Sequence, residues 1–426
     1  MTITINKPLR GGTIRAISSK SEAHRLLICA ALSDEETFIA CPESSEDIDA
    51  TARCLIILGA SVWHQNEGFN VIPINRDVLA DNKKLYRLDC GESGATLRFI
   101  LPICGALGIN AEINMSGRLP ERPLSDLYNE MVSHGCKLSE QGTSPLTCHG
   151  QLKSGKYLLP GNITSQYISG LLFALPLLKG NSSIRITSAF QSRPYVDITL
   201  HLLNNFGIRV IEEDYGFFVP GNQTFRSPKA VTTGGDWSNA AFWLSAGAIG
   251  PGSITCTNLS SESQQGDKKI SELLKRFGAH VFTDKDSVTV SPNKLKGMEI
   301  DAGDIPDLVP VLAAVASVAD GQSTIYNAEQ LRHKESNRIR TVTKLLTNLG
   351  ADIKETDDGM IINGKRTLTG GKTETFGDHR IAMSAAIISA ACENDVTIEG
   401  AEVVNKSYPS FYTDFRTILG GDFKED

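Results

Sequence analysis

The chain has 426 residues, of which 41% are hydrophobic, and a net charge of −7 from 42 basic and 49 acidic side chains. This composition excludes wholesale disorder, disfavours general nucleic-acid binding, and includes no apolar run of the roughly 18 residues that a membrane helix needs. The nine cysteines are scattered without a Cys-x-x-Cys motif, which predicts reduced thiols, a cytoplasmic protein and no structural zinc. The first five residues lack the basic start and apolar core of a signal peptide.

A helix ending in a glycine recurs six times along the chain. The helices before these glycines carry apolar residues at spacings of three and four. Glycine adopts the left-handed backbone conformation at low cost, so each copy predicts a helix end, and chance similarity of common helix endings is the alternative. The marker glycines, 70 to 76 residues apart, are Gly59, Gly135, Gly207, Gly278, Gly350 and Gly420.

A second, more apolar helix lies in phase with the first in every copy. A β-branched run such as 182–187 follows most of these helices, and turns such as Tyr215-Gly216 predict a hairpin. The unit is therefore helix, strand, helix and hairpin, and six repeats of it predict an α/β (α+β) fold. The expected apolar helices are 21–32, 94–107, 165–178, 236–249, 307–319 and 378–391.

The first eighteen residues supply a piece that the sixth copy lacks. That copy stops at Gly421-Asp422-Phe423 before a hairpin, whereas 2–5 and 13–17 have the pattern of strands around a turn at 10–12. If the N-terminus completes the last repeat, the array closes, and an open solenoid is the alternative. We therefore expect two pseudo-threefold domains, one of residues 19–233 and one of residues 1–18 with 234–426.

Polar and basic residues gather at the starts of the apolar helices. Helix N-termini attract anions, although plain capping by Ser, Thr or Asp is the alternative at each position. Basic residues oppose the helix dipole there, and a multiply anionic small molecule held between the domains would explain them. The basic residues are Lys20, Arg25, Arg98, Arg122, Arg193, Arg338, Arg380 and Lys406, and Arg122-Pro123 and Arg193-Pro194 occupy equivalent places 71 residues apart.

Two carboxylates accompany these cations. Asp307 follows Pro306 before an apolar run, where it could act as a general acid or base, or cap the helix. Glu335 lies between Lys334 and Arg338, where it could move a proton or form an i,i+3 ion pair at a solvated helix start.

The chain resembles the 5-enolpyruvylshikimate-3-phosphate synthase family nearly end to end. The resemblance implies the inside-out α/β barrel of the enolpyruvyl transferases, with the active site in the interdomain cleft. It also implies transfer of the enolpyruvyl group from phosphoenolpyruvate to the 5-hydroxyl of shikimate-3-phosphate, by addition–elimination with loss of phosphate. The matching segments are 19–21 with Arg25, 91–98, 121–124, 165–166, 192–197, 265–267, 305–307, 332–338, 377–380 and 406–409.

The resemblance implies a role for each site residue, with no metal and no cofactor. Lys20, Asp307 and Glu335 would move protons, and Lys20, Gln166 and Asp307 would contact the substrates. The remaining phosphoenolpyruvate ligands would be Gly94, Arg122, Arg338, Arg380 and Lys406. Shikimate-3-phosphate, bound mainly by the 19–233 domain, would contact Ser21, Arg25, Thr164, Ser165, Ser192, Gln330 and Lys334. The expected protein is a cytoplasmic monomer without nucleic-acid or membrane partners.

The sequence departs from the commonest family pattern at a few positions. Glu92 and Ala95 stand where Asn and Thr are frequent, which bears on inhibitor sensitivity and phosphoenolpyruvate affinity. Gln330 and His24 each stand where Asn is frequent.

Three other functions remain as alternatives. The sister transferases acting on UDP-N-acetylglucosamine usually carry a cysteine five residues before their Arg-Pro motif, where this chain has Gly117. A binding module without chemistry is opposed by Asp307 and Glu335, because acidic groups weaken anion binding. A nucleic-acid end-processing enzyme of related architecture is disfavoured by the net charge.

Overall fold

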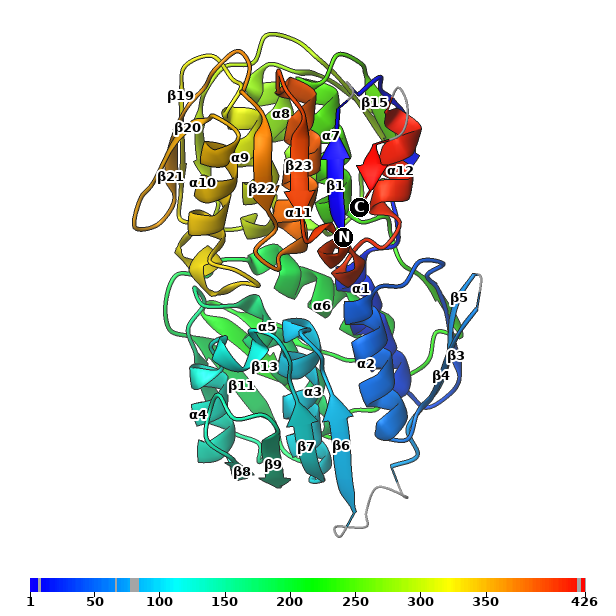
Figure 1. Cartoon of the computed structure of the whole chain (residues 1–426). Coiled ribbons are helices and arrows are strands. Elements are labelled where there is room, and N and C mark those ends of the chain that lie inside the picture. The colour runs from blue at the N-terminus through cyan, green and yellow to red at the C-terminus, as the bar shows by residue number, and fades with distance from the viewer. Residues whose placement is uncertain (7–8, 66, 77–83, 420–422, 426) are drawn as a thin grey trace. The chain divides into compact units, whose positions relative to one another are not determined.

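The structure is a computed structural model that describes residues 1–6, 9–65, 67–76, 84–419 and 423–425 (Figure 1). The chain divides into two compact units, each described by itself below. Unit A is Ser18–Thr233, and unit B is Met1–Ile17 together with Gly234–Asp426.

Unit A contains the first three repeats. Its helices are α1 (Lys20–Ala31), α2 (Glu46–Ile57), α3 (Gly94–Leu107), η1 (Leu119–Glu121), α4 (Ser125–Ser133), α5 (Ser165–Ala174), η2 (Leu175–Leu177) and α6 (Arg193–Asn205). Its strands are β3 (Thr37–Ala40), β4 (Ser61–Gln65), β5 (Gly68–Ile72), β6 (Leu85–Asp89), β7 (Asn110–Asn114), β8 (Cys136–Leu138), β9 (Leu146–Gly150), β10 (Lys156–Leu159), β11 (Ser182–Ile186), β12 (Ile211–Glu213), β13 (Gly216–Val219) and β14 (Ala230–Thr232).

Unit B contains the other three repeats. Its helices are α7 (Trp237–Ile249), η3 (Gly266–Lys269), α8 (Ile270–Phe277), η4 (Pro306–Leu308), α9 (Val309–Ala316), η5 (Glu329–His333), α10 (Arg338–Asn348), α11 (His379–Ile388), η6 (Ser389–Ala391), η7 (Ala401–Lys406) and α12 (Phe411–Ile418). Its strands are β1 (Thr2–Ile5), β2 (Gly12–Arg15), β15 (Ile254–Thr257), β16 (His280–Thr283), β17 (Ser287–Ser291), β18 (Glu299–Asp301), β19 (Gln322–Tyr326), β20 (Asp352–Glu355), β21 (Met360–Asn363), β22 (Gly371–Glu374), β23 (Val396–Glu399) and β24 (Lys424–Glu425).

Within the described residues, the strands form six four-stranded sheets of one topology. In the sheet β6-β7-β9-β8, the first pair is parallel and the next two pairs are antiparallel. The other sheets repeat this order as β14-β3-β5-β4, β10-β11-β13-β12, β2-β15-β17-β16, β18-β19-β21-β20 and β22-β23-β1-β24. The six predicted repeats are confirmed.

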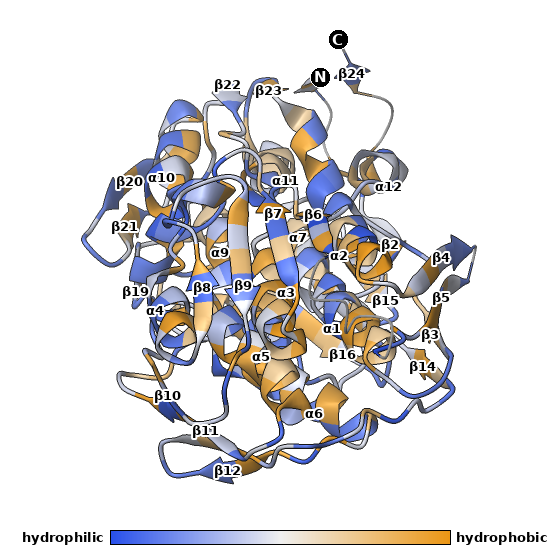
Figure 2. Cartoon of the chain, turned by 90° about the horizontal axis from the view of Figure 1, so that it is seen from below, coloured by the Kyte–Doolittle hydropathy of each residue, from blue (hydrophilic) through white to orange (hydrophobic). Residues whose placement is uncertain are grey.

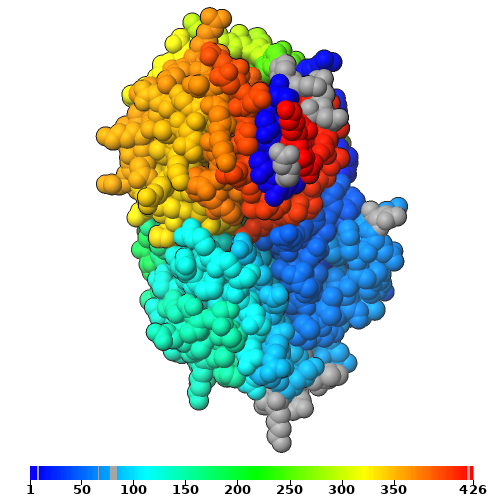
Figure 3. Space-filling view, viewed as in Figure 1, coloured from blue at the N-terminus to red at the C-terminus, as the bar shows by residue number. Residues whose placement is uncertain are grey.

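The N-terminal strands join two different sheets of unit B. Strand β1 pairs antiparallel with β23 and β24 in the sixth repeat, and Figure 3 shows the N-terminal residues in blue against the C-terminal residues in red. Strand β2 instead pairs parallel with β15 in the fourth repeat. The expectation that both strands complete the sixth repeat is therefore wrong for β2. The sixth repeat also has a last strand of its own, β24, which follows residues 421–423, where we expected this repeat to end.

The marker glycines have the left-handed backbone conformation that the sequence predicts for them. Their φ angles lie between 75° and 113° at Gly59, Gly135, Gly207, Gly278 and Gly350. Gly420 lies outside the described residues, as do Gly421 and Asp422.

Several apolar helices differ from their predicted bounds, since α9 ends at Ala316 before the predicted residue 319 and α11 ends at Ile388 before 391, and proline explains two other differences. Proline lacks the N–H that continues an α-helix. The helix expected from Asp307 starts as η4 and becomes α-helical only at Val309, because Pro310 cannot donate to the Pro306 carbonyl. The helix expected to reach Leu178 ends at Ala174 and continues as η2, which contains Pro176.

The apolar helices form a separate core in each unit. Helices α1, α3 and α5 supply buried side chains to unit A, and α7, α9 and α11 do so in unit B. Figure 2 shows α5 coloured as hydrophobic over much of its length. Because the sides of these helices are covered, their ends are the places left for polar chemistry. No helix in the described part of the chain is long and apolar enough to cross a membrane.

Candidate active site

Lys20 is the first residue of α1, in unit A. Ser19 caps this helix by accepting a hydrogen bond from the Glu22 amide at 3.4 Å. Lys20 Nζ lies 2.9 Å from Asp47 Oδ2 in the first turn of α2, and the two side chains are only 17% and 9% exposed. The ion pair therefore holds the Lys20 ammonium at the joint start of α1 and α2.

Arg25 lies one turn further along α1 and is buried. Its Nε donates to Thr199 Oγ1 at 2.7 Å, its Nη1 to the Ser21 carbonyl at 2.6 Å and its Nη2 to the Tyr195 carbonyl at 3.0 Å. Thr199 Oγ1 also bonds Ser169 Oγ at 2.8 Å. This network joins α1, α5 and α6 and fixes Ser21 and Arg25 together.

Gly94 begins α3, where a side chain would displace the ends of two arginine side chains. A Cβ there would lie 2.6 Å from Arg98 Nη1 and 2.8 Å from Arg122 Nη1. Arg98 donates from Nη1 to Gln166 Oε1 at 2.8 Å and from Nη2 to the Pro123 carbonyl at 2.9 Å. Two guanidinium groups therefore lie beside the free N–H groups at the start of α3, an arrangement suited to an anion.

The predicted residues Thr164, Ser165 and Gln166 form the start of α5. Thr164 Oγ1 caps the helix by accepting from the Gln166 amide at 3.3 Å, and Ser165 is buried. Ser192 precedes α6 with a left-handed φ of 54° and is also buried. All four residues thus lie at helix starts of unit A.

Arg193, whose Arg-Pro motif matches that of Arg122 in sequence, is bound by two carboxylates of its own repeat. Its Nε lies 2.6 Å from Asp197 Oδ1 and its Nη2 lies 2.9 Å from Glu212 Oε2. Asp197 lies one turn further along α6 and Glu212 lies on β12, so the Arg193 guanidinium is bound within its own repeat.

In unit B, Arg338 gathers three carboxylates around one buried guanidinium. Its Nη1 lies 2.9 Å from Asp307, its Nη2 lies 2.7 Å from Glu335, and its Nε lies 2.9 Å from Asp378. Ser336 Oγ also donates to Asp378 Oδ2 at 3.0 Å. The Arg338 side chain is 2% exposed, so the i,i+3 pair with Glu335 is not the solvated helix start that the sequence left open.

Asp307 lies between two guanidinium groups. Arg380 donates from Nη2 to Asp307 Oδ2 at 2.9 Å and from Nη1 to the Asp307 carbonyl at 3.2 Å. Asp307 makes no capping bond, whereas Asp378 caps α11 by accepting from the Arg380 amide at 3.0 Å. The alternative role of Asp307 as a helix cap is therefore wrong.

The charges of this cluster hold Asp307 in its ionised form. Burial would raise the pKa of the Asp307 carboxyl, but Arg380, Arg338 and Lys334 outweigh burial and lower the pKa well below its ordinary value. Burial would lower the pKa of Arg338, but Asp378, Glu335 and Asp307 raise it well above its ordinary value. The positive charges of the arginines and the negative charges of the carboxylates in this cluster therefore balance one another.

The other predicted residues of unit B lie on neighbouring segments. Gln330 is buried in η5, and its Nε2 donates to the Gly303 carbonyl at 3.1 Å. Lys334 follows η5 directly. Lys406 is the last residue of η7, which packs against α11, the helix that carries Arg380.

Arg98 was predicted only as one of the cations near helix starts, and Asp378 was not predicted as a site residue, although both join predicted catalytic or substrate-binding residues. Arg98 connects the starts of α3 and α5, and Asp378 connects α10 and α11. Their signal in the sequence was a charge at the start of an otherwise apolar helix.

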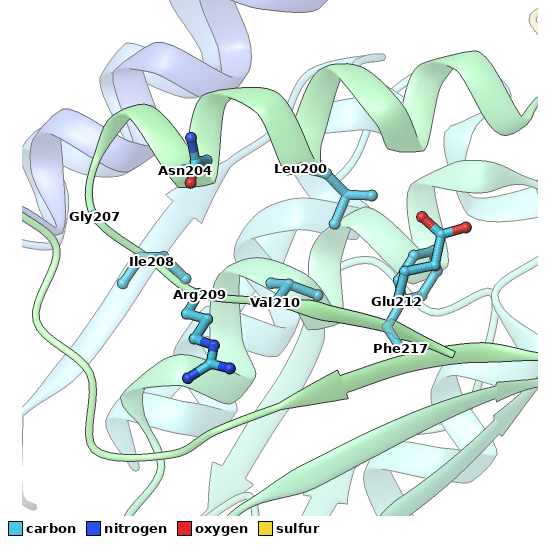
Figure 4. Close-up of a pocket in the computed structure, with 8 residues that line it drawn as sticks. All are labelled: Leu200, Asn204, Gly207, Ile208, Arg209, Val210, Glu212 and Phe217. Atoms are coloured by element: carbon cyan, nitrogen blue, oxygen red, sulfur yellow. The ribbon is translucent and has the colours of Figure 1, made fainter. Parts of the chain in front are cut away.

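The described residues contain no group of three or more His, Cys, Asp or Glu side chains that could hold a metal ion. A cavity of about 360 Å³ lies beside α6 and the β12–β13 hairpin (Figure 4). It contains none of the predicted site residues and is lined by Leu200, Asn204, Gly207, Ile208, Arg209, Val210, Glu212 and Phe217.

Solved structures identify the fold as that of the enolpyruvyl transferases. EPSP synthase from Acinetobacter baumannii superposes over 100% of both chains with a TM-score of 0.82 at 24% identity. The enolpyruvyl transferase NikO from Streptomyces tendae has a TM-score of 0.78 at 16% identity and covers 99% of this chain and 98% of its own. At these identities the likeness concerns the fold alone.

Sequence comparison identifies the family. The family of EPSP synthase (3-phosphoshikimate 1-carboxyvinyltransferase) matches residues 3–415. The 3-phosphoshikimate 1-carboxyvinyltransferase of Clostridium kluyveri is 42% identical over 99% of this chain and 98% of its own length. The chain belongs to the EPSP synthase family, which is a family of transferases.

Proposed function

We propose that this protein transfers the enolpyruvyl group of phosphoenolpyruvate to the 5-hydroxyl of shikimate-3-phosphate and releases phosphate. The observation that carries the proposal is Asp307, an ionised carboxylate held between Arg338 and Arg380. A base fixed among anion-binding cations suits a reaction that moves protons beside two phosphorylated substrates.

Phosphoenolpyruvate is the ligand assigned to Gly94, Arg122, Arg380 and Lys406. Guanidinium groups bind carboxylate and phosphate through paired, charge-assisted hydrogen bonds. At Gly94 the lack of a side chain lets an oxyanion approach the free N–H groups of α3. Arg338 supports this site chiefly through the carboxylates that it binds.

Shikimate-3-phosphate is the ligand assigned mainly to unit A. Arg25 and Lys334 supply positive charge for its phosphate, and Gln166, whose Oε1 accepts a hydrogen bond from Arg98, is assigned to contact both substrates. Hydroxyl and amide groups complete the set, namely Ser21, Thr164, Ser165, Ser192 and Gln330. One transfer needs both sets of residues on the same pair of substrates, so the proposal requires the two units to act together.

The reaction moves protons in a fixed order. The 5-hydroxyl oxygen bonds to C2 of phosphoenolpyruvate and gives up its proton, while the methylene carbon gains one. The methyl group then loses a proton as the bond to phosphate breaks. Asp307, Glu335 and Lys20 are the groups assigned to these transfers, with typical contributions of about 10²–10⁴-fold each.

Substrate binding would make Asp307 a stronger base. An anion that engages Arg380 takes hydrogen-bond donors away from the Asp307 carboxylate, while the burial of that carboxylate remains. Because burial raises the pKa of Asp307 and the arginines lower it, the pKa rises when the substrate arrives. The carboxylate then accepts a proton more readily.

The sister transferases are disfavoured at Gly117. This glycine has a left-handed φ of 54°, and a Cβ there would collide with Glu92 Oε1. The position therefore has no room for the cysteine of that family while Glu92 keeps its place. A monomeric, cytoplasmic protein stays a prediction from the sequence.

Coupled phosphate release tests the proposal. Purified protein should release phosphate when phosphoenolpyruvate and shikimate-3-phosphate are both present, and not with either alone. Release with UDP-N-acetylglucosamine in place of shikimate-3-phosphate would overturn the assignment in favour of the sister reaction. Binding of both substrates without any release would instead support a binding module.

A further inference from the structure

A buried chain of hydrogen bonds runs through unit A from α1 to the start of α3. His24 Nδ1 lies 2.7 Å from Thr51 Oγ1, which lies 2.7 Å from Thr96 Oγ1. Thr96 Oγ1 donates to Ser93 Oγ at 2.8 Å. None of the four side chains is more than 1% exposed. The chain thus begins on α1 and ends at the residue that precedes Gly94.

The direction of these bonds follows from the number of hydrogens. A hydroxyl group has one hydrogen to donate. Because the Thr96 hydroxyl donates to Ser93 Oγ, or at the longer distance of 3.5 Å to the Asp47 carbonyl, Thr51 must donate to Thr96, and His24 Nδ1 must donate to Thr51. His24 is therefore the tautomer that carries its proton on Nδ1.

The ring makes no other hydrogen bond. His24 Nε2 has no partner within the described ranges, and the ring meets Phe99 edge-on at 6.5 Å. Burial lowers the pKa of His24 to about 3, so the ring is neutral near pH 7. Leaving His24 Nε2 buried without a hydrogen bond destabilises the fold, and an apolar side chain at this position would avoid that cost. The bond to Thr51 is thus what the imidazole contributes.

The chain connects elements that carry predicted site residues. Ser93 Oγ caps α3 by accepting from the Thr96 amide at 3.3 Å, directly before Gly94. Lys20 lies one turn before His24 on α1 and pairs with Asp47 on α2, the helix that carries Thr51. One set of buried bonds therefore fixes the start of α3 relative to the helices that hold Lys20.

We propose that His24 is a positioning residue for the reaction, acting through Thr51 and Thr96 to orient Ser93 and the free N–H groups of α3 at Gly94. The inference rests on the proposed function, since it assigns those N–H groups to phosphoenolpyruvate. It predicts that the affinity for this substrate depends on a donor at position 24. An asparagine amide can supply the same donor to Thr51.

Steady-state kinetics of four variants test the role. His24→Leu and Thr51→Val should each raise KM for phosphoenolpyruvate about tenfold and leave KM for shikimate-3-phosphate within about twofold. The double variant should be no worse than either single one, because both break the same chain. His24→Asn should restore KM. An unchanged KM for phosphoenolpyruvate in His24→Leu, or additive effects in the double variant, would overturn the inference.

Ser33→Ala is the matched control for lost stability. Ser33 Oγ is also buried and donates to the Ala30 carbonyl at 2.8 Å, at the other end of α1. This variant should lower the melting temperature without changing KM for phosphoenolpyruvate. An equal rise in KM would mean that any weakening of α1 has this effect, and would contradict a specific role for His24. If His24→Leu does not fold, His24→Asn and the nearly isosteric Thr51→Val carry the test.

Nitrogen-15 NMR of the ligand-free protein gives a readout independent of activity. The His24 ring proton should be on Nδ1 and should stay there between about pH 5 and pH 8, since the ring is neutral. A proton on Nε2 would refute the bond direction and with it the inference. A wild-type protein that releases no phosphate would instead refute the proposed function, so the two failures are distinguishable.

Discussion

Asp307 is the residue at which burial and charge oppose each other most clearly. Its carboxylate bonds Arg338 and Arg380, and its backbone carbonyl bonds Arg380 as well. Asp307→Asn keeps the shape and removes the base. We expect kcat to fall by about 10²–10⁴-fold while phosphoenolpyruvate binds as well or more tightly, because a negative charge has been lost beside an anion site.

Asp304→Asn is the control for this change. Asp304 lies three residues earlier on the same segment and is exposed. Calorimetry with phosphoenolpyruvate and turnover measurements should show values near wild type for this control. A kcat close to wild type in Asp307→Asn would remove Asp307 from the proton transfers.

The same carboxylate predicts a pH dependence of stability. Asp307 has a folded-state pKa below its ordinary value of 3.8, so its ion pairs stabilise the fold fully above about pH 4. That stability is lost as the pH falls towards the folded-state pKa. The difference in melting temperature between wild type and Asp307→Asn should therefore be constant from about pH 7 to pH 5 and shrink below about pH 4. A difference that grows on acidification would contradict the ion pairs.

The sequence predicted where the site residues lie better than what they touch. Residues such as Lys20 and Thr164 stand at helix starts, and a helix start is visible in sequence because capping and apolar spacing are local. The bonds of Arg98 to Gln166 and of Asp378 to Arg338 join segments 68 and 40 residues apart. Those contacts depend on which helix ends meet, which no local pattern specifies.

At the scale of single elements, the repeat depends on glycines at helix ends. Gly278 has a φ of 113°, and a Cβ there would lie 2.6 Å from the Lys294 carbonyl. Gly321, in the same unit, has a φ of 93° but open space around it. Gly321→Ala should cost only the left-handed backbone, about 1–2 kcal/mol, and Gly278→Ala should cost more because the backbone of Lys294 must also move.

Differential scanning calorimetry of the full-length variants distinguishes these two free-energy costs. A larger drop in melting temperature for Gly278→Ala than for Gly321→Ala is the expected result. Equal drops would show that the close approach to Lys294 contributes nothing.

The types of the helices and strands could be predicted from the sequence more readily than their exact ends or the pairing of the strands. Helix and strand types were predictable from apolar spacing and turn glycines, whereas the 3₁₀ start around Pro306 and the early end of α5 required counting N–H donors. The placement of β2 beside β15 was not predictable, because strand partners are chosen by packing far along the chain.

At the scale of the whole molecule, the first strand belongs to the fold of the last repeat. Ile3 on β1 is fully buried in the core of unit B, whereas its neighbour Thr2 is only partly buried. Ile3→Ala should destabilise unit B by about 2–5 kcal/mol, and Thr2→Ala should have little effect.

Hydrogen exchange followed by mass spectrometry localises this effect. Peptides covering β23, which pairs with β1, should exchange faster in Ile3→Ala, while peptides of unit A should be unchanged. Faster exchange throughout unit A would contradict the division of the chain into two units with separate cores.

The central claim is that this chain carries out enolpyruvyl transfer by adding and then removing a proton at the methylene carbon. Turnover in D₂O, followed by proton NMR and mass spectrometry, tests it directly. With phosphoenolpyruvate and shikimate-3-phosphate, the account predicts an enolpyruvyl ether product with deuterium in its methylene group, and one phosphate for each product. A product without deuterium would contradict the addition–elimination route, and no product at all from this pair would contradict the function.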